Sequence, residues 1–345
     1  MDIIKEEIKD DIDDGYYYYD PEIVPVPFGL NNIGAICWFN SLLQLMLGLS
    51  SVNRTLLENK HELSTNVFAR EYIHLLESIL PNNKERIISN VAVLSDKSAA
   101  ILHAFQIQLK KMGKLAIIGT GQECTDEGFT LFIEALNCPS VERLFSNIYE
   151  LSITCTGCSK KVSTIRDNSC RIQMFTRVML KNQSEFCKWI IIHPSEVDVF
   201  KCECGKIMQK FYRTEKLKMV REVIIVIFNK FQSKENRWYP NTLEFPAKNA
   251  TKLKYKMVGK IEHAGTRFGG HYWAHSLRGE FKRLNDSSVG SGNDDPTTET
   301  FMVAYHLVDD TAIPNDTTKA IPNDATKAIP NDTTKAIPNN DLSLL

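Results

Sequence analysis

The stretch GLNNIGAICWFNSLLQLMLG, residues 29–48, contains the most informative cysteine of the chain, Cys37. A turn rich in Gly and Asn leads into apolar residues at helical spacing, which predicts a helix over 40–49 capped by Asn40 or Ser41. The cysteine then lies at or just before the helix start, where free N–H groups and a partial positive charge favour the thiolate. A buried core cysteine is the alternative interpretation. The polar approach to the helix favours a nucleophilic thiol.

A thiol nucleophile needs a base, and the segment HAGTRFGGHYWAHSL, residues 263–277, offers one. Two glycines come directly before His271 and permit close backbone approach at the entry of a predicted strand. His263 and His275 are competing candidates, and His275 shares a strand face with His271 because side chains alternate along a strand. The spacing favours His271 as the base.

A third polar element follows in LNDSSV, residues 284–289. Asn285 and Asp286 can orient an imidazole, as the third member of a catalytic triad does. A Cys–His–Asn or Cys–His–Asp set is chemically complete for acyl transfer. We therefore expect these segments, which are far apart in the sequence, to meet in the folded protein.

The same segments resemble the sequence boxes of ubiquitin-specific proteases. GLNNIGAICWFNSLLQ resembles the family's Cys box, with Trp38 where the family commonly has Tyr. HAGTRFGGHYWA together with LNDSSV resembles the His box. QECTDEGFTLFIEAL, residues 122–136, resembles the helix that the family places between them. Three boxes in the family's order span nearly all of residues 28–308, which makes the resemblance specific.

The resemblance implies an α+β, papain-like cysteine protease with a helical thumb, a β-rich palm and β fingers that carry a zinc ribbon. It implies that Cys37 is the nucleophile and His271 the general base. Asn285 matches the third triad position, and Asp286 supports it. Asn32 matches the side chain that helps to form the oxyanion hole, although its NNIG context would also explain a turn residue.

Two cysteine pairs indicate a metal site. A structural zinc site takes four thiolates in a tetrahedron, usually from two knuckles. The first pair here is C-x-x-C in ITCTGCSKK, and the second is a shorter C-x-C in FKCECGKI. The resemblance points to the same fingertip site. Cys170 and Cys187 are alternatives to Cys202. The predicted ligands are Cys155, Cys158, Cys202 and Cys204, and no catalytic cofactor is expected.

The order of predicted elements is helical first and β-rich afterwards, which suggests an α+β fold. Expected helices cover residues 40–49, 66–80, 99–110 and 127–136. Expected strands cover residues 148–154, 162–165, 211–217, 222–228, 255–263, 271–277 and 302–307. We expect an acidic disordered arm (1–27), a catalytic domain (28–308, with a thumb at 28–147, fingers at 148–222 and a palm at 223–308) and a disordered tail of octapeptide repeats (309–345).

Composition limits the other classes of function. The chain has 345 residues and a formal net charge of −1, which argues against a dedicated nucleic-acid binder. It has no apolar stretch of about 20 residues that would span a membrane, and its acidic N-terminus is no secretory signal. Nine cysteines without such a signal predict a reducing compartment, the cytoplasm or nucleus. We expect a monomer.

The predicted activity is that of a deubiquitinating thiol protease. It would hydrolyse the isopeptide or peptide bond after the C-terminal glycine of ubiquitin, with ubiquitin and ubiquitinated proteins as partners. Two alternatives remain at this stage. One is a catalytically weak pseudo-protease that binds ubiquitin or acts as a scaffold, and the other is a protease for another ubiquitin-like modifier.

Overall fold

The structure is a computed structural model that describes residues 18–80, 96–114, 123–174, 180–228, 238–246, 252–266 and 269–308. All of these lie in one compact unit, residues 1–311. Residues 1–17 of the predicted acidic arm and the whole predicted repeat tail lie outside the described residues. None of the described helices is both long and apolar enough to cross a membrane.

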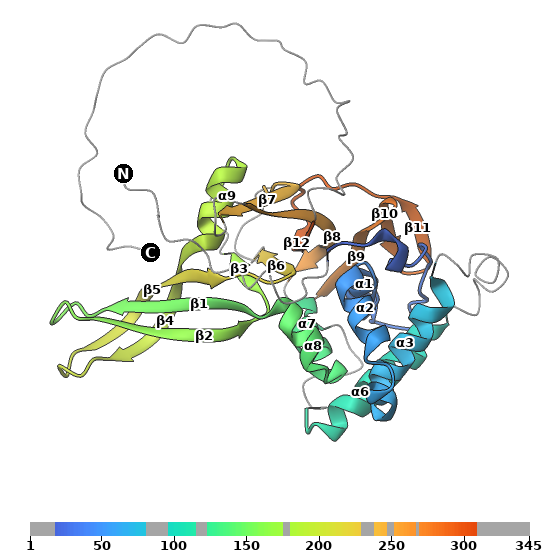
Figure 1. The fold of residues 1–345 in the computed structure, drawn as a ribbon, viewed down its shortest axis with the longest axis horizontal. Coiled ribbons are helices and arrows are strands. Elements are labelled where there is room, and N and C mark those ends of the chain that lie inside the picture. Colours follow the sequence, from blue (N-terminus) through green and yellow to red (C-terminus); the bar gives the residue numbers. More distant parts are fainter. Residues whose placement is uncertain are drawn as a thin grey trace, which may run out of the picture. The chain divides into compact units, whose positions relative to one another are not determined.

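Helices fill the first part of the described chain, as predicted (Figure 1). The first helical element is a short 3-10 turn. Helix α1, which carries the thiol, is buried along its whole length. The helical elements are η1 (Pro21–Ile23), α1 (Cys37–Leu47), α2 (Ser50–Glu58), η2 (Glu62–Thr65), α3 (Val67–Ile79), α6 (Lys97–Lys111), α7 (Thr125–Leu136) and α8 (Pro139–Phe145).

The predicted start of α1 is wrong by three residues, because the helix begins at Cys37 and not at Asn40. Neither Asn40 nor Ser41 caps it. The Oδ1 atom of Asn32 instead accepts a hydrogen bond from the backbone N–H of Ile36 at 3.3 Å. The thiol therefore lies on the first helical residue, where the sequence analysis expected it at or just before the start.

Asn66 joins α3 to α7. Its Oδ1 accepts hydrogen bonds from the N–H groups of Phe68 and Ala69, which caps α3. Its Nδ2 donates to the carbonyls of Ala135 and Leu136 at the end of α7, each at 2.9 Å. Behind this junction, rings from α1, α3, α6 and α7 pack together and form the helical core. The rings are Phe39, Phe68, Phe105 and Phe132.

The palm is an eight-stranded sheet with the order β11-β10-β9-β8-β12-β6-β3, with β7 paired to β8. Helix α1 packs against β8 and β9, so that the thiol and imidazole segments are neighbours. The palm strands are β3 (Ile172–Met174), β6 (Val223–Phe228), β7 (Thr242–Pro246), β8 (Lys252–Thr266), β9 (Gly269–Arg278), β10 (Glu280–Asn285), β11 (Ser288–Ser291) and β12 (Thr300–Leu307).

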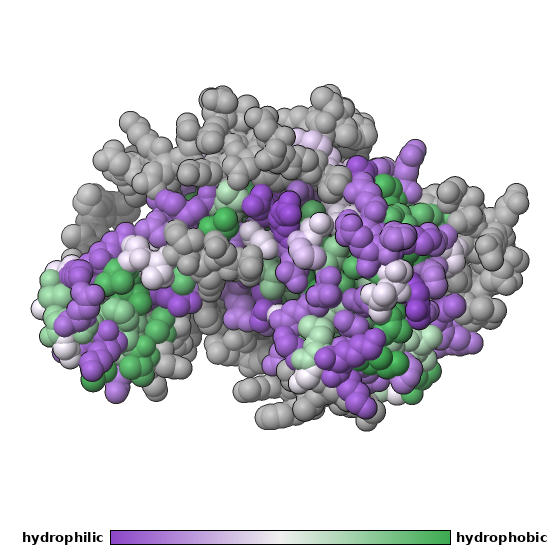
Figure 2. Space-filling view, turned by 60° about the horizontal axis from the view of Figure 1, so that its bottom comes forward, coloured by the Kyte–Doolittle hydropathy of each residue, from purple (hydrophilic) through white to green (hydrophobic). Residues whose placement is uncertain are grey.

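The fingers are a separate four-stranded sheet with the order β2-β1-β5-β4, which extends to the left in Figure 1. Helix α9 (Gln183–Ile191) leads directly into its strand β4. On the surface, apolar and polar patches alternate over the fingers (Figure 2), and Val199, Ile207 and Tyr212 are exposed there. The finger strands are β1 (Asn147–Thr154), β2 (Lys161–Ser169), β4 (Ile192–Lys201) and β5 (Ile207–Met219).

Residues 18–27, which the sequence analysis assigned to a disordered arm, are folded against the domain. The N–H of Tyr19 donates to the carbonyl of Leu307 on β12 at 3.1 Å. Asp20 forms an ion pair with Arg54 on α2 at 2.6 Å. The predicted boundary is too late for this segment, because Val24 is buried and Val26 packs against the helical core.

Candidate active site

The Cys37 thiol lies at the start of α1, and only 3% of the residue is exposed. Burial raises the pKa of the Cys37 thiol, and the nearby Asp286 carboxylate acts in the same direction. Backbone N–H groups of Tyr272, Trp38 and Cys37 itself oppose the rise without cancelling it. Desolvation of the buried sulfur therefore acts against the thiolate preference that the helix N-terminus predicts.

The His271 imidazole is held by Asn285. Its Nε2 lies 2.6 Å from the Oδ1 of Asn285, at the end of β10. Because an amide oxygen only accepts, this contact assigns the proton to Nε2 and leaves the lone pair on Nδ1. The Cys37 thiol receives a hydrogen bond from the backbone of Tyr272, the next residue after His271. The three predicted triad segments therefore meet at one place.

Asp286 joins the Cys box to the His box. Its Oδ2 accepts from the side-chain amide of Asn32 at 3.0 Å, and its Oδ1 accepts from that of Asn40 at 2.8 Å. The backbone adds a third link, since the N–H of Leu30 donates to the carbonyl of Asp286 at 2.8 Å. This close approach requires Gly29, where a Cβ atom would lie 2.2 Å from the Ser287 carbonyl oxygen.

The two competing histidines are engaged elsewhere. His263 is 1% exposed, and its ring packs on Tyr272 with centroids 4.2 Å apart. His275 is 5% exposed and bonds to Glu262 at 3.0 Å. The His271 side chain is 41% exposed. Of the three, only His271 is open to an incoming substrate.

The sequence analysis missed two contributors to this site. Asn40 was expected as a helix cap, but it binds Asp286. Trp273, two residues after His271, stacks on the imidazole with centroids 6.1 Å apart. The alternation of side chains along a strand was a usable signal for Trp273, because it places both rings on one face. No local signal identifies a partner of Asn40.

The four predicted metal ligands lie together at the tip of the fingers. Their sulfur atoms are all within 4.8 Å of one another. The Sγ atoms of Cys155 and Cys204 are 3.7 Å apart, as are those of Cys158 and Cys202. A tetrahedral zinc site with Zn–S bonds of about 2.3 Å requires S···S distances of about 3.8 Å. The four thiols therefore have the spacing that holds such a metal.

The backbone around Cys155 favours its thiolate, whereas the pKa of Cys202 in the same cluster is raised by desolvation and by the neighbouring thiols. Backbone N–H groups of Cys158 and Gly157 lower the pKa of the Cys155 thiol to about 6. The shorter C-x-C knuckle closes through a turn in which the N–H of Gly205 donates to the carbonyl of Cys202 at 2.9 Å. Gly205 has a φ of +87°, a conformation that glycine adopts without strain. Thiolate is the form that binds metal, so the cluster fits a cation.

Comparison with known proteins gives one family and one fold. The sequence model described as "Ubiquitin carboxyl-terminal hydrolase" matches residues 28–309. A search of curated proteins finds no significant match to the chain.

Solved structures similar to this chain include several of the SAGA DUB module. One contains Ubp8, Sgf11, Sus1 and Sgf73 bound to monoubiquitin; it has a TM-score of 0.62 and 17% identity, over 86% of this chain and 72% of that one. A second, bound to ubiquitin aldehyde, has a TM-score of 0.60 and 17% identity, and the match covers 84% of this chain and 71% of that one. A yeast module with a mutant Sgf73 has a TM-score of 0.53 and 18% identity, and the match covers 84% of this chain and 70% of that one. At this identity the likeness shows the fold, and it confirms the predicted α+β protease fold.

Proposed function

Because this chain belongs to the ubiquitin carboxyl-terminal hydrolase family, we propose that it is a thiol protease that cleaves after the C-terminal glycine of ubiquitin. The bond would be the isopeptide or peptide bond that joins ubiquitin to a protein. The observation that carries the proposal is that Cys37, at the start of α1, accepts a hydrogen bond from the backbone of Tyr272, the neighbour of His271, whose imidazole bonds to Asn285.

In the proposed reaction the Cys37 thiol is protonated at rest, since burial raises its pKa. The Nδ1 lone pair of His271 accepts the thiol proton as sulfur attacks the glycine carbonyl. His271 then gives that proton to the leaving lysine amine, and the acyl group stays on sulfur. A water molecule, deprotonated by the same imidazole, hydrolyses the thioester and restores the thiol. Asn285 keeps the imidazole in the tautomer that these steps require.

The tetrahedral oxyanion needs hydrogen-bond donors, and we assign this role to the Asn32 side chain together with backbone N–H groups at the start of α1. The Asn32 amide already donates to Asp286, which keeps the side chain next to the nucleophile. Removal of one such donor costs about 3 kcal/mol in comparable sites. Asp286 is thus a supporting residue that orients Asn32.

For the four clustered thiols we propose a structural zinc ion, with Cys155, Cys158, Cys202 and Cys204 as ligands. The donor set supports zinc because four thiolates saturate a tetrahedral site and leave no position for substrate. The ion would hold the tips of β1 and β4–β5 together. Chemistry in the proposed reaction comes from the thiol and imidazole, without a catalytic cofactor.

A second candidate function is a catalytically weak pseudo-protease that binds ubiquitin or acts as a scaffold. The observation that favours it is the burial of Cys37, with 3% exposed and a raised pKa. A protease for another ubiquitin-like modifier would use the same site.

We also propose a reducing location, the cytoplasm or nucleus, because a thiol nucleophile and four thiolate ligands all need reduced cysteines. Ubiquitin and ubiquitinated proteins are the proposed partners. The expected monomer stays a prediction, and the similar Ubp8 is found together with Sgf11, Sus1 and Sgf73.

The deciding experiment is reaction with ubiquitin whose C-terminus carries a thiol-reactive warhead. Wild type should form a covalent adduct and Cys37→Ala should not. Cys124→Ala is the matched control, because this half-buried thiol lies outside the proposed triad and its loss should leave the adduct intact. Bound ubiquitin without an adduct would favour the pseudo-protease. No binding, with an adduct from another modifier's warhead, would replace ubiquitin as the substrate.

A further inference from the structure

One face of the palm sheet carries a row of polar side chains beside the proposed triad. On β8 and β9, Ala264 pairs with His271, Glu262 with Trp273 and Lys260 with His275. Directly paired residues point to the same face of a sheet, so the imidazole, the indole and Glu262 lie side by side on that face. The proposed reaction leaves Trp273 and Glu262 without a role.

The indole of Trp273 covers one side of the His271 ring. Their centroids are 6.1 Å apart and the ring planes are 25° from parallel, within the range of offset stacking. With 41% of its side chain exposed, His271 is open to solvent on part of its surface. Asn285 holds one edge of the imidazole through Nε2, and the indole restrains its face.

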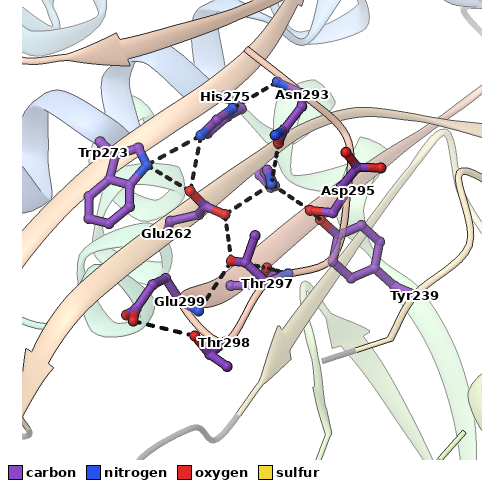
Figure 3. Close-up of polar contacts among 11 residues, drawn as sticks. Tyr239, Glu262, Trp273, His275, Asn293, Asp295, Thr297, Thr298 and Glu299 are labelled. Carbon is purple, nitrogen blue, oxygen red and sulfur yellow. Dashed lines mark hydrogen bonds and ion pairs between the residues drawn. The ribbon is translucent and has the colours of Figure 1, made fainter. Parts of the chain in front are cut away.

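The indole is itself held in place from the other side. Its Nε1–H donates to the Oε2 of Glu262 at 2.7 Å, shown in Figure 3. The Nδ1 of His275 accepts from the backbone N–H of Asn293 at 3.1 Å, so the proton of that ring lies on Nε2 and also points to Glu262. The Arg283 guanidinium lies over the indole, 5.3 Å from its centroid. The ring is therefore held along an edge and over a face.

Glu262 is a buried and fully occupied anchor. Its Oε1 accepts from Lys260 at 2.9 Å and from the hydroxyl of Thr297 at 2.7 Å. Lys260 is 0% exposed, and its ammonium group also donates to Asn293 and to the carbonyl of Asp295. Burial would raise the pKa of Glu262, but the hydrogen bond from His275 and the charge of Lys260 hold it well below its usual range. The anchor stays ionised and immobile.

We propose that Trp273 is a positioning residue for His271, with Glu262 fixing the indole against the imidazole. This rests on the proposed function for the role of His271 in turnover. The indole does not touch the reacting atoms in this proposal. It restrains the imidazole ring that takes up the thiol proton, so its loss should lower the rate of chemistry and leave ubiquitin binding unchanged.

The test compares Trp273→Phe, which keeps a ring but loses the donor to Glu262, with Trp273→Leu, which loses the ring. Tyr305→Phe is the control for lost stability, since it removes a buried hydrogen bond from the Tyr305 hydroxyl to the carbonyl of Pro240. For each full-length variant, kcat and KM are measured on a ubiquitin substrate and normalised to the fraction of active sites. The rate of Cys37 alkylation by iodoacetamide is measured in parallel, because it needs no ubiquitin.

Trp273→Leu should lose about tenfold in kcat with KM unchanged, since small misplacement of a catalytic group has effects of this order. Trp273→Phe should recover part of that loss, and alkylation rates should follow the same order. A raised KM with normal kcat would make the indole a substrate contact and overturn the proposal, as would wild-type rates in both variants. Wild type could fail to cleave ubiquitin while the alkylation rates still fall from wild type through Trp273→Phe to Trp273→Leu. The proposed function would then be wrong and the positioning role would stand. If wild type does not cleave ubiquitin and the variants alkylate at the wild-type rate, the proposed function and the positioning role are both wrong.

Discussion

The side-chain amide of Asn32 donates a hydrogen bond to the carboxylate of Asp286 at 3.0 Å, across 254 positions of sequence. The oxygen of the same amide accepts from the backbone N–H groups of Gly34 and Ile36, inside the turn that leads to Cys37. Asn32 is therefore both a turn residue and a link between the two catalytic boxes. This one arrangement accounts for the turn interpretation of Asn32 and is compatible with its proposed role in the oxyanion hole.

Replacement of Asn32 by Ala should lower kcat about 100-fold or more with little change in KM, because one oxyanion donor is lost. The measurement is steady-state cleavage of a ubiquitin substrate. Asn31→Ala is the matched control, since that neighbouring amide bonds to Asp96 on the surface. Equal losses in both variants would assign the effect to the loop. If Asn32→Ala keeps the wild-type kcat, the proposed role of Asn32 in the oxyanion hole is wrong.

The buried thiol should alkylate slowly at neutral pH. Burial raises the pKa of the Cys37 thiol above its ordinary value, so the thiolate forms only as pH rises through that higher value. Iodoacetamide labelling of Cys37, followed by mass spectrometry from pH 6 to 10, should show a midpoint above about 8.5. A midpoint below that value would mean that desolvation does not dominate the pKa of this thiol. Cys37→Ala provides the background.

Loss of a fingertip ligand should remove the metal. Cys155→Ser is expected to lower the zinc content of the protein from about one ion per chain to near zero and to lower the melting temperature. Cys170→Ser is the control, because Cys170 is half-buried against the helical core and lies outside the cluster. Metal analysis and thermal melting would check both. Zinc retained by Cys155→Ser, or lost by Cys170→Ser, would contradict the ligand set.

Gly128 on α7 makes room for the Trp38 indole. A Cβ atom at this position would lie 2.7 Å from the Cζ3 of Trp38. Gly→Ala inside a helix usually stabilises by about 0.5–1 kcal/mol, but overpacking of a buried contact costs about 1–3 kcal/mol. Gly128→Ala should therefore lower the free energy of unfolding of the protein, measured by urea denaturation. The double variant with Trp38→Tyr should recover stability, and additive losses would argue against the contact.

Glu222 gives a pH dependence of stability. Burial raises the pKa of its carboxyl to about 7, against the opposing effects of its own backbone N–H, Arg221 and Arg143. Between the ordinary carboxyl value and pH 7 the folded protein holds a proton that the unfolded chain has released, so stability falls as pH rises. A shift of this size corresponds to about 3 kcal/mol by pH 8.

Glu222→Gln should therefore be more stable than wild type at pH 8 by up to about 3 kcal/mol. At pH 5 the two proteins should differ little. Urea unfolding at both values checks this. Glu77→Gln is the control, because its surface ion pair with Lys60 is worth less than about 1 kcal/mol at either pH. A wild type whose stability does not change over this range would contradict the shift.

Short-range patterns were enough to predict much of the fold. The predicted helix over 66–80 corresponds to α3, and Asn66 caps it. The run around Trp189 was not assigned, because its apolar residues suit a helix and a strand equally and α9 passes into β4 within it. Strands β10 and β11 were missed because they are short and contain few buried residues, so they lack a clear apolar alternation.

The sequence by itself determined which residues are the candidates for the proposed chemistry: a cysteine at a helix start, a histidine after two glycines, an Asn-Asp pair and two cysteine knuckles. Each of these depends on neighbours within a few positions, and local backbone geometry follows from local sequence. Only the tertiary structure decided that the Cys37 thiol is buried with a raised pKa, that Asp286 joins Asn32 to Asn40, and that Glu262 holds the indole of Trp273. Desolvation and hydrogen bonding depend on what packs around a group, and here those neighbours come from distant parts of the chain.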